Sequence, residues 1–399
     1  MNQIMYRIFR GVGKATEDCS HSKYLRGSKQ PPFHFSIQDD NLPATQRLSP
    51  QLKDLSPKMK TISFFNNKGG VGKTTLTGNI AAYFALEKNK RVLIIDCDPQ
   101  CNITQFILGD SKTIDLYWPS NDKKEETKSK TVLDLVGPII SGDAEINSRI
   151  KPLRSSMNRF GVDLLPGHPR FSTFEDELSA AWSELPTGKA GGFRRTNWLY
   201  SYLSSIEDQY DLVFIDVSPS LGALNRSVLL SSDHFITPLG ADAFSVLGIR
   251  NISRWMTGWL EYYEVGLEQS NRLNPNGLND YDIRTELEIK NGFLGYTLQQ
   301  YIAKAKAGVK RPTKAYERII QDIPGEIQNY LQSFNSISNT DPHLGDVPNL
   351  YSLIPLAQSV NAPIVALGSG DGLVGNQYSQ ARNYKGIIGD LAESILARV

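Results

Sequence analysis

The chain has 399 residues, of which 40% are hydrophobic and 21% are charged, and its formal net charge is +1. This composition is that of a globular protein with a sizeable core, and no apolar run approaches the roughly 18 to 20 residues of a membrane helix, which argues against a membrane-spanning protein. The three cysteines are too few for a disulfide framework and fit a reducing, cytoplasmic setting.

Residues 11–58 are rich in Ser, Pro, Gln and Lys and show no clear period. Residues 1–60 hold ten Lys/Arg against five Asp/Glu, whereas the rest of the chain is mildly acidic. We therefore expect a basic, flexible arm over 1–58 and a folded domain over 59–399. Met59 stands directly before the first strong strand, so the sequence leaves open whether translation starts at Met1 or near Met59.

From residue 61 onward, short apolar runs alternate with helical stretches. Continuous apolar runs indicate strands buried on both faces, and their alternation with helices predicts a three-layer α/β fold with a mostly parallel, roughly eight-stranded sheet. The predicted strands are 61–65, 91–96, 161–167, 211–216, 234–240, 291–298, 350–355 and 363–368. The predicted helices are 73–88, 171–182, 194–207, 244–260, 313–330 and 378–397. Two polar stretches, near 110–130 and 263–290, are predicted to be solvated insertions.

The stretch NNKGGVGKTT, residues 66–75, follows the first predicted strand and opens the first predicted helix. Its glycines allow a tight turn that points backbone N–H groups inward, and the helix start adds a partial positive charge. This context predicts a phosphate-binding loop in which Lys73 contacts the β- and γ-phosphates and the Thr74 hydroxyl ligates Mg²⁺. The predicted nucleotide-binding residues here are Gly69, Gly70, Val71, Gly72, Lys73, Thr74 and Thr75.

Asn67 stands where the general phosphate-loop pattern has a glycine, and an additional lysine, Lys68, follows it. The segment KGGVGKTT resembles the deviant Walker A motif of the ParA/MinD family of P-loop ATPases, and is most similar to that of the ParA-like members. The resemblance implies a P-loop NTPase fold, ATP and Mg²⁺ as ligands, and hydrolysis to ADP and phosphate. It also implies a homodimer that encloses two ATP molecules, in which Lys68 reaches the partner's phosphates and acts with Lys73 as a catalytic cation.

The stretch RVLIIDCDPQCNIT, residues 91–104, resembles the family's second signature, D-x-D-P-Q-x-N. Two carboxylates two residues apart at a strand end project to the same side. The resemblance implies that Asp98 positions or activates the attacking water and that Asp96 supports the Mg²⁺ site. The alternative is that both residues only cap the segment that follows the strand.

Two later stretches also resemble the family. YDLVFIDVSPSLG, residues 210–222, is similar to the Walker B strand and switch, which implies that Asp216 is an outer-sphere partner of Mg²⁺. Ser218 stands where the family commonly has a proline, so the switch backbone is expected to be freer. The resemblance further implies that Asn225 contacts nucleotide and that Pro355, in LIPLAQSVNAPIVALG, contacts the adenine base.

MinD-like members bind membranes through a basic C-terminal helix, whereas ParA-like members bind DNA. The C-terminal IIGDLAESILARV has one basic residue and two acids, which disfavours a membrane surface. The stretch 301–319, YIAKAKAGVKRPTKAYERI, is the candidate for non-specific contact with DNA phosphates, and a solvated helix face explains it equally well. Its basic residues are Lys304, Lys306, Lys310, Arg311, Lys314 and Arg318.

The resemblance therefore implies a cytoplasmic ATPase for plasmid or chromosome partition or positioning, with a ParB-like or other activating protein as its partner. The alternative is a nucleotide-gated switch that positions a protein cargo without binding DNA. A ligase built on the same scaffold fits less well, because the second lysine and the D-x-D-P-Q signature occur together. An iron–sulfur relative is disfavoured, since no cysteine follows Cys101.

Overall fold

The computed structural model describes residues 58–118, 130–299, 303–306, 309–312, 314–335, 340–350 and 352–399. For 303–306, 309–312 and 314–317 it describes the backbone alone. The predicted N-terminal arm therefore lies outside the described residues, except for Lys58. Within the described part of the chain, no helix combines the length and the apolar character that crossing a bilayer requires.

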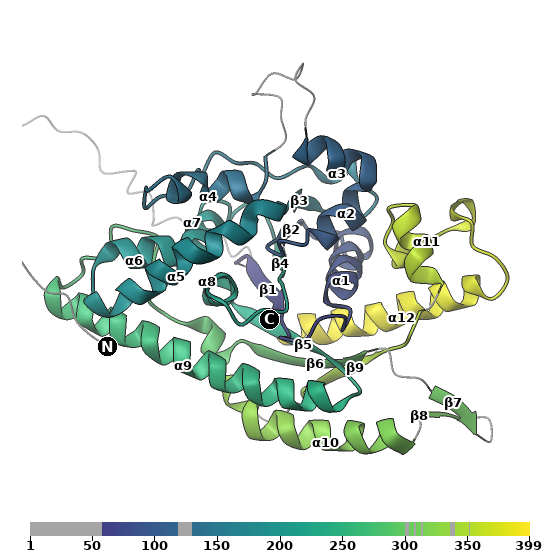
Figure 1. The fold of residues 1–399 in the computed structure, drawn as a ribbon. Coiled ribbons are helices and arrows are strands. Elements are labelled where there is room, and N and C mark those ends of the chain that lie inside the picture. Colours follow the sequence, from purple (N-terminus) through teal and green to yellow (C-terminus); the bar gives the residue numbers. More distant parts are fainter. Residues whose placement is uncertain are drawn as a thin grey trace, which may run out of the picture. The chain divides into compact units, whose positions relative to one another are not determined.

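A parallel sheet forms the centre of the domain (Figure 1). In the part of the chain that the structure describes it has seven strands, in the order β3-β2-β4-β1-β5-β6-β9, and each neighbouring pair is parallel. Its strands are β1 (Lys60–Phe64), β2 (Val92–Asp96), β3 (Asp163–Leu165), β4 (Leu212–Asp216), β5 (His234–Gly240), β6 (Phe293–Gln299) and β9 (His343–Val347). The predicted mostly parallel α/β sheet is confirmed, with seven strands in place of about eight.

The central strands are apolar at successive positions because both faces of the sheet are covered. In β4, Val213 and Ile215 enter one hydrophobic core, whereas Leu212 and Phe214 enter the other. β2 divides its side chains in the same way, with Ile95 in the first core and Ile94 in the second. The two cores correspond to the two helical layers.

The helices form one layer on each face of the sheet (Figure 1). The first layer is built from α4 (Val132–Ile140), α5 (Phe174–Glu184), α6 (Ala190–Thr196), α7 (Trp198–Ser204), α8 (Ala223–Ser231), α9 (Ala243–Leu273) and α10 (Lys314–Tyr330). The second is built from α1 (Lys73–Glu87), α2 (Asn102–Leu108), α11 (Leu353–Ser359) and α12 (Gln377–Leu396), with α3 (Asp110–Tyr117) beside α2.

Helix α9 is held against its neighbours by specific contacts. The carboxylate of Asp242 caps its first turn by accepting hydrogen bonds from the backbone N–H groups of Phe244 and Ser245, at 3.0 and 3.2 Å. Two glycines permit close approach along its length, because a Cβ at Gly248 would lie 2.9 Å from Asn67 Oδ1 and one at Gly266 would lie 2.9 Å from a backbone oxygen. Because α9 extends to Leu273, the first part of the predicted insertion near 263–290 belongs to this helix.

Two predicted strands are wrong. Within the predicted strand 350–355, residues 353–355 form the start of helix α11, because Leu353 and Ala357, about one helical turn apart, both face the second core. Residues 363–368 form a short 3₁₀ turn, η7 (Ile364–Ala366), after Pro363. The edge beside β6 is occupied instead by β9, which the sequence analysis did not predict.

The basic stretch at 301–319 is not one continuous helix. Strands β7 (Ala303–Lys306) and β8 (Val309–Pro312) form an antiparallel pair, in which Lys304 is opposite Arg311, and α10 follows. The first half of the stretch therefore consists of strands, so the alternative of a solvated helix face does not apply to it.

Candidate functional site

The predicted phosphate loop connects β1 to α1 at the carboxyl edge of the sheet. Gly70 and Gly72 have φ values of 74° and 76°, a left-handed conformation that a glycine adopts without strain. The Lys73 ammonium donates to the backbone oxygens of Asn66 and Lys68, each at 3.1 Å, so it lies inside the curve of the loop. Burial lowers the pKa of Lys73, and Asp216 and Asp98 oppose that shift.

Asn66 fixes the start of this loop. Its side-chain amide donates to the backbone oxygen of Pro238 in β5 at 2.6 Å, and its side-chain oxygen accepts from the Lys68 N–H at 2.9 Å. The loop is thereby attached to two neighbouring strands. The sequence analysis did not identify this role, because the partner lies 172 residues away.

Two acids stand next to the loop because of strand register. Asp96 and Asp216 are paired positions at the ends of β2 and β4, and both side chains are fully buried. Among the described residues, neither carboxylate oxygen of Asp216 has a hydrogen-bond donor of ordinary geometry. Burial and then the charge of Asp96 raise the pKa of Asp216, while the nearby Thr74 hydroxyl lowers it in part. Two buried carboxylate oxygens without a donor, beside a threonine hydroxyl, fit the charge and ligand preference of Mg²⁺ or its bound water.

Asp96 has a different environment. It accepts hydrogen bonds from the Asp98 N–H and the Thr104 N–H, each at 3.1 Å, and from the Thr104 hydroxyl at 2.5 Å. Burial raises its pKa to about 7, against the effect of these donors. Asp96 therefore braces the start of α2, and it also borders the cation position beside Asp216.

Asp98, the predicted catalytic carboxylate, is 6% exposed and follows β2 by two residues. It accepts from the Gln100 N–H at 2.9 Å, and burial raises its pKa despite the attraction of Lys73. A carboxylate with a raised pKa is a stronger proton acceptor than one in water.

Lys68 has a partner of its own, separate from the phosphate loop. Its ammonium forms an ion pair with Asp242, the residue that caps α9. Both side chains are 33% exposed. Burial raises the pKa of Asp242, but the hydrogen bond and the charge of Lys68, together with the hydrogen bonds from Ser245, outweigh burial and lower the pKa overall. The two lysines of the loop thus occupy different environments.

The segment after β4 touches the phosphate loop. A Cβ at Gly69 would lie 3.7 Å from Pro219, which is ordinary contact distance. Asn225 donates from its side chain to the backbone oxygens of Ser218 and Ser220, at 2.8 and 2.7 Å, and so holds this segment from α8. A contact of Asn225 with nucleotide stays a prediction.

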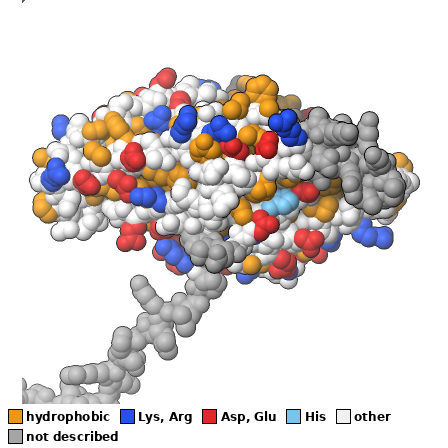
Figure 2. Space-filling view, turned by 90° about the horizontal axis from the view of Figure 1, so that it is seen from below, with side chains coloured by type: hydrophobic (Ala, Val, Ile, Leu, Met, Phe, Trp, Pro, Cys, Tyr) orange, Lys and Arg blue, Asp and Glu red, His pale blue; other side chains and the backbone are white. Residues whose placement is uncertain are grey.

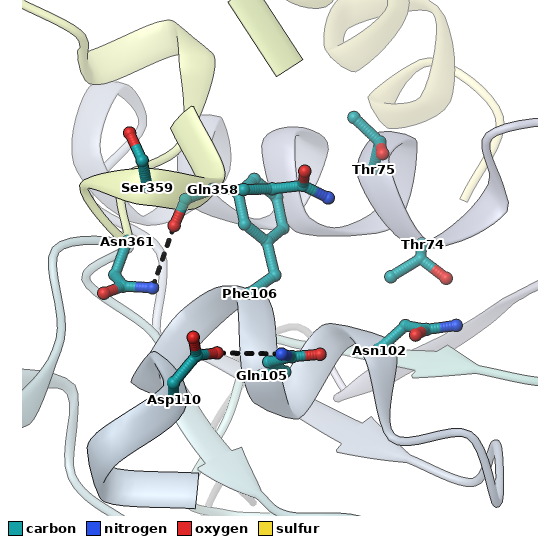
Figure 3. Close-up of a pocket in the computed structure, with 9 residues that line it drawn as sticks. All are labelled: Thr74, Thr75, Asn102, Gln105, Phe106, Asp110, Gln358, Ser359 and Asn361. Atoms are coloured by element: carbon teal, nitrogen blue, oxygen red, sulfur yellow. Dashed lines mark hydrogen bonds between the residues drawn. The ribbon is translucent and has the colours of Figure 1, made fainter. Parts of the chain in front are cut away.

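A cavity of about 580 Å³ opens beside the phosphate loop (Figure 3). Its walls come from the start of α1, from α2 and the first residue of α3, and, more than 240 residues further along the chain, from the end of α11 and the turn after it. The lining residues are Thr74, Thr75, Asn102, Gln105, Phe106, Asp110, Gln358, Ser359 and Asn361. Because two residues of the phosphate loop line it, the cavity is the natural place for the rest of a bound nucleotide.

Specific contacts fix the cavity walls. Asn79 on α1 donates to the backbone oxygen of Thr75 at 2.8 Å and accepts from the Val365 N–H at 3.3 Å, so it ties η7 to the phosphate-loop helix. Gly109 has a φ of 78°, and a Cβ there would lie 2.3 Å from Asn361 Oδ1. Only a glycine fits this position between α2 and α3.

Pro355 is exposed on α11, one turn before Gln358 in the cavity wall. Its predicted contact with the base is not tested by this arrangement and stays a prediction. The sequence analysis did not select Gln358, Ser359 and Asn361, which the structure brings to the cavity. Their only signal in the sequence was their position in the same LIPLAQSVNAPIVALG stretch.

Comparison with known proteins identifies the family. A family profile described as an AAA domain matches residues 59–263, half of the chain. The chain belongs to this AAA-domain family. The match contains the phosphate loop, the two acid-bearing strands and helices α1 to α8.

The AAA-domain relatives include partition proteins. The chain is 27% identical over 200 residues to a virulence plasmid ParA family protein of Chlamydia psittaci, an alignment that covers 49% of this chain and 63% of that protein. It is 28% identical over 229 residues to the chromosome-partitioning ATPase Soj of Treponema pallidum, covering 57% of this chain and 74% of the relative. The predicted resemblance to ParA-like ATPases is confirmed.

A solved structure supports the same fold. The crystal structure of protein DIP2308 from Corynebacterium diphtheriae is similar to this chain with a TM-score of 0.64 and 33% sequence identity. The similarity covers 85% of this chain and 98% of that one. The AAA-domain fold therefore extends beyond the residues of the family match.

Proposed function

We propose that the chain is a Mg²⁺-dependent ATPase that dimerises around ATP and drives the partition or positioning of DNA. The observation that carries the proposal is the meeting of Lys73, Asp98 and Asp216 around one phosphate loop at the carboxyl edge of the sheet. Membership of a family with ParA and Soj relatives supports the same function.

The loop supplies the phosphate site. Backbone N–H groups around Gly70 and Gly72, together with the start of α1, favour negative charge. Lys73 exchanges the backbone oxygens of Asn66 and Lys68 for phosphate oxygens when ATP binds. Bound Mg²⁺ neutralises phosphate charge, and Thr74 and Asp216 are the residues that would hold it.

Hydrolysis requires a proton acceptor and an additional cation. The water oxygen bonds to the γ-phosphorus, the bridging P–O bond breaks with its electron pair going to ADP, and Asp98 accepts the proton of the water. Lys68 of one protomer stabilises the charge on the partner's phosphates. The ion pair with Asp242 shows that this side chain reaches away from its own loop, which supports a role in trans.

Three substitutions separate binding from turnover. Lys73→Ala is expected to abolish binding of a fluorescent ATP analogue, whereas Lys68→Ala and Asp98→Asn are expected to retain binding and lose ADP formation. Lys385→Ala, which removes a lysine paired with Glu87 on the surface, is the matched control. Equal turnover in Lys68→Ala and the parent would contradict the trans-acting lysine.

The DNA part of the proposal depends on basic residues. The β7–β8 pair brings Lys304 opposite Arg311, and phosphate contacts need only such a concentration of cations. On the face shown in Figure 2, Lys and Arg side chains are mixed with Asp and Glu. The test is retention of arbitrary duplex DNA with ATP and its loss as salt rises. ATP-dependent dimers that ignore DNA would instead favour the positioning of a protein cargo.

A further inference from the structure

A second hollow lies between α5, α8 and α9, outside the nucleotide cavity. Its volume is about 510 Å³, which is within the range of ligand sites in proteins. We call it the α5–α8–α9 hollow. The residues that line it are Ser179, Trp182, Ser183, Arg226, Arg254, Trp255, Gly258, Trp259 and Tyr262.

Its walls are a network of aromatic rings. Trp182 and Trp255 each make an edge contact with Trp259, with ring centroids 5.7 and 5.9 Å apart. Trp255 also stacks on Phe65, the residue that follows β1, at 5.3 Å. Interlocked rings lose little conformational entropy on binding and provide a large contact area, which is why aromatic residues dominate binding hot spots.

The charged lining residues are both cations, and neither forms an ion pair with a described residue. Arg254 is exposed and forms no ion pair with any described residue, and Arg226 lies over the Trp182 ring at 5.9 Å. Arg226 Nε is buried and has no hydrogen-bond acceptor among the described residues. The nearest acid, Glu175, already accepts the N–H groups of Ala223 and Leu224 at the start of α8. A ligand for this hollow therefore has to bring its own negative charge.

Gly258 has no packing role within the described chain. A glycine inside a helix costs roughly 0.5–1 kcal/mol relative to alanine. At Gly248 and Gly266 of the same helix, close neighbours account for that cost, but a Cβ at Gly258 would have nothing within 4 Å. Gly258 is exposed, so the absence of a side chain leaves the hollow open to solvent at this position.

We infer that the α5–α8–α9 hollow is the docking site for an acidic peptide segment of a protein partner, which inserts an aromatic or leucine side chain next to a carboxylate. The exposed face of α9 continues past the hollow, from Leu247 at 52% exposed to Val265 at 55% exposed. These positions share one side of the helix with Arg254 and Gly258, at spacings of seven, four and seven residues. The surface is therefore elongated, which suits a peptide better than a compact small molecule.

Selection of random twelve-residue peptides displayed on phage, on the immobilised full-length chain, tests this inference without assuming a sequence. The expected outcome is enrichment of peptides that carry Asp or Glu beside Trp, Phe or Leu. Gly258→Leu fills the hollow and is expected to weaken the selected peptides at least about tenfold. Gly258→Ala raises helix propensity at least as much as leucine does but leaves the hollow open, so it is the matched control and should bind like the parent.

Arg254→Gln, on the solvent side, provides a second variant that keeps the fold intact and is expected to weaken binding several-fold, most clearly at low salt. Thermal melting of Gly258→Leu at or above the parent's temperature verifies its fold. Failure to enrich any peptide, enrichment of basic or uncharged peptides, or equal binding by Gly258→Leu would overturn the inference. So would a loss of ATP-dependent self-association in Gly258→Leu by light scattering, because the occupant would then be a second copy of this chain.

Discussion

The ion pair between Lys68 and Asp242 predicts that Asp242→Asn promotes ATP-dependent dimerisation. In the proposed dimer Lys68 has to leave Asp242 to reach the partner's phosphates, so the ion pair opposes association. Asparagine removes the negative charge but keeps an oxygen that accepts the N–H groups of Phe244 and Ser245. Because asparagine is as good a helix cap as aspartate, α9 should remain intact.

The magnitude follows from the environment of the pair. Both side chains are one-third exposed, which places the contact between a surface ion pair and a buried charged hydrogen bond, at about 1 kcal/mol. A symmetric dimer breaks the contact twice, once in each protomer. The substitution should therefore favour the dimer by about 2 kcal/mol, or roughly 30-fold in its dissociation constant.

Sedimentation with a non-hydrolysable ATP analogue measures this constant directly. Asp371→Asn, which removes an acid from the Arg159 ion pair, is the matched control and should leave dimerisation unchanged. A dissociation constant for Asp242→Asn equal to or weaker than that of the parent, with an unchanged melting temperature, would refute the reasoning. The contact would then be a structural ion pair that does not restrain Lys68.

Three other predictions concern stability and the cavity. Burial lowers the pKa of His234 to about 4, below its unfolded value, so the unfolded state takes up a proton first as pH falls, and His234 contributes a loss of about 3 kcal/mol between pH 6.5 and 4. Asp96, whose pKa is raised to about 7, changes stability in the opposite sense over this range, so the test compares urea unfolding of the parent and of His234→Gln at both pH values, and the loss should be smaller by about that amount in His234→Gln. Gly109→Ala should lower the melting temperature and weaken nucleotide binding, because the new Cβ meets the side chain of Asn361. Adding Asn361→Ala to this variant should restore part of the binding, and a double variant without any restoration would exclude this contact as the cause. Trp198→Ala should cost about 3–5 kcal/mol in urea unfolding, since the ring is fully buried in the first core, and a loss under 1 kcal/mol would contradict that packing.

The site acids could be predicted from sequence because their placement follows from a local rule. Asp96 and Asp216 each end a buried strand, and parallel strands present their carboxyl ends at one edge. Asp242 could not be predicted to pair with Lys68, because 174 residues separate them and the register of β5 beside β1 decides the contact. The cavity residues at the end of α11 could not be predicted either, because their position depends on how this distant part of the chain packs beside α1.

The errors in strand prediction have a physical cause as well. A short apolar run such as 350–355 suits a buried strand or a helix, and packing against the second core decided in favour of α11. β9 contains Gly345 and Asp346 and does not look like a core strand. It nevertheless pairs with β6 as the edge strand of the sheet, because β6 offers backbone groups that need hydrogen-bond partners.

Asn79 connects the first turn of α1, next to the cavity, to η7, which follows the α11 wall, through one side chain. The amide nitrogen is anchored one turn into α1, and the amide oxygen holds the backbone that follows the opposite wall. A displacement of the first turn of α1 is therefore transmitted to Val365 without passing through the sheet. In the proposed function, contact with the triphosphate at the loop and contact with the base near α11 are therefore expected to be coupled, and a ligand that lacks either end should not make full use of this connection.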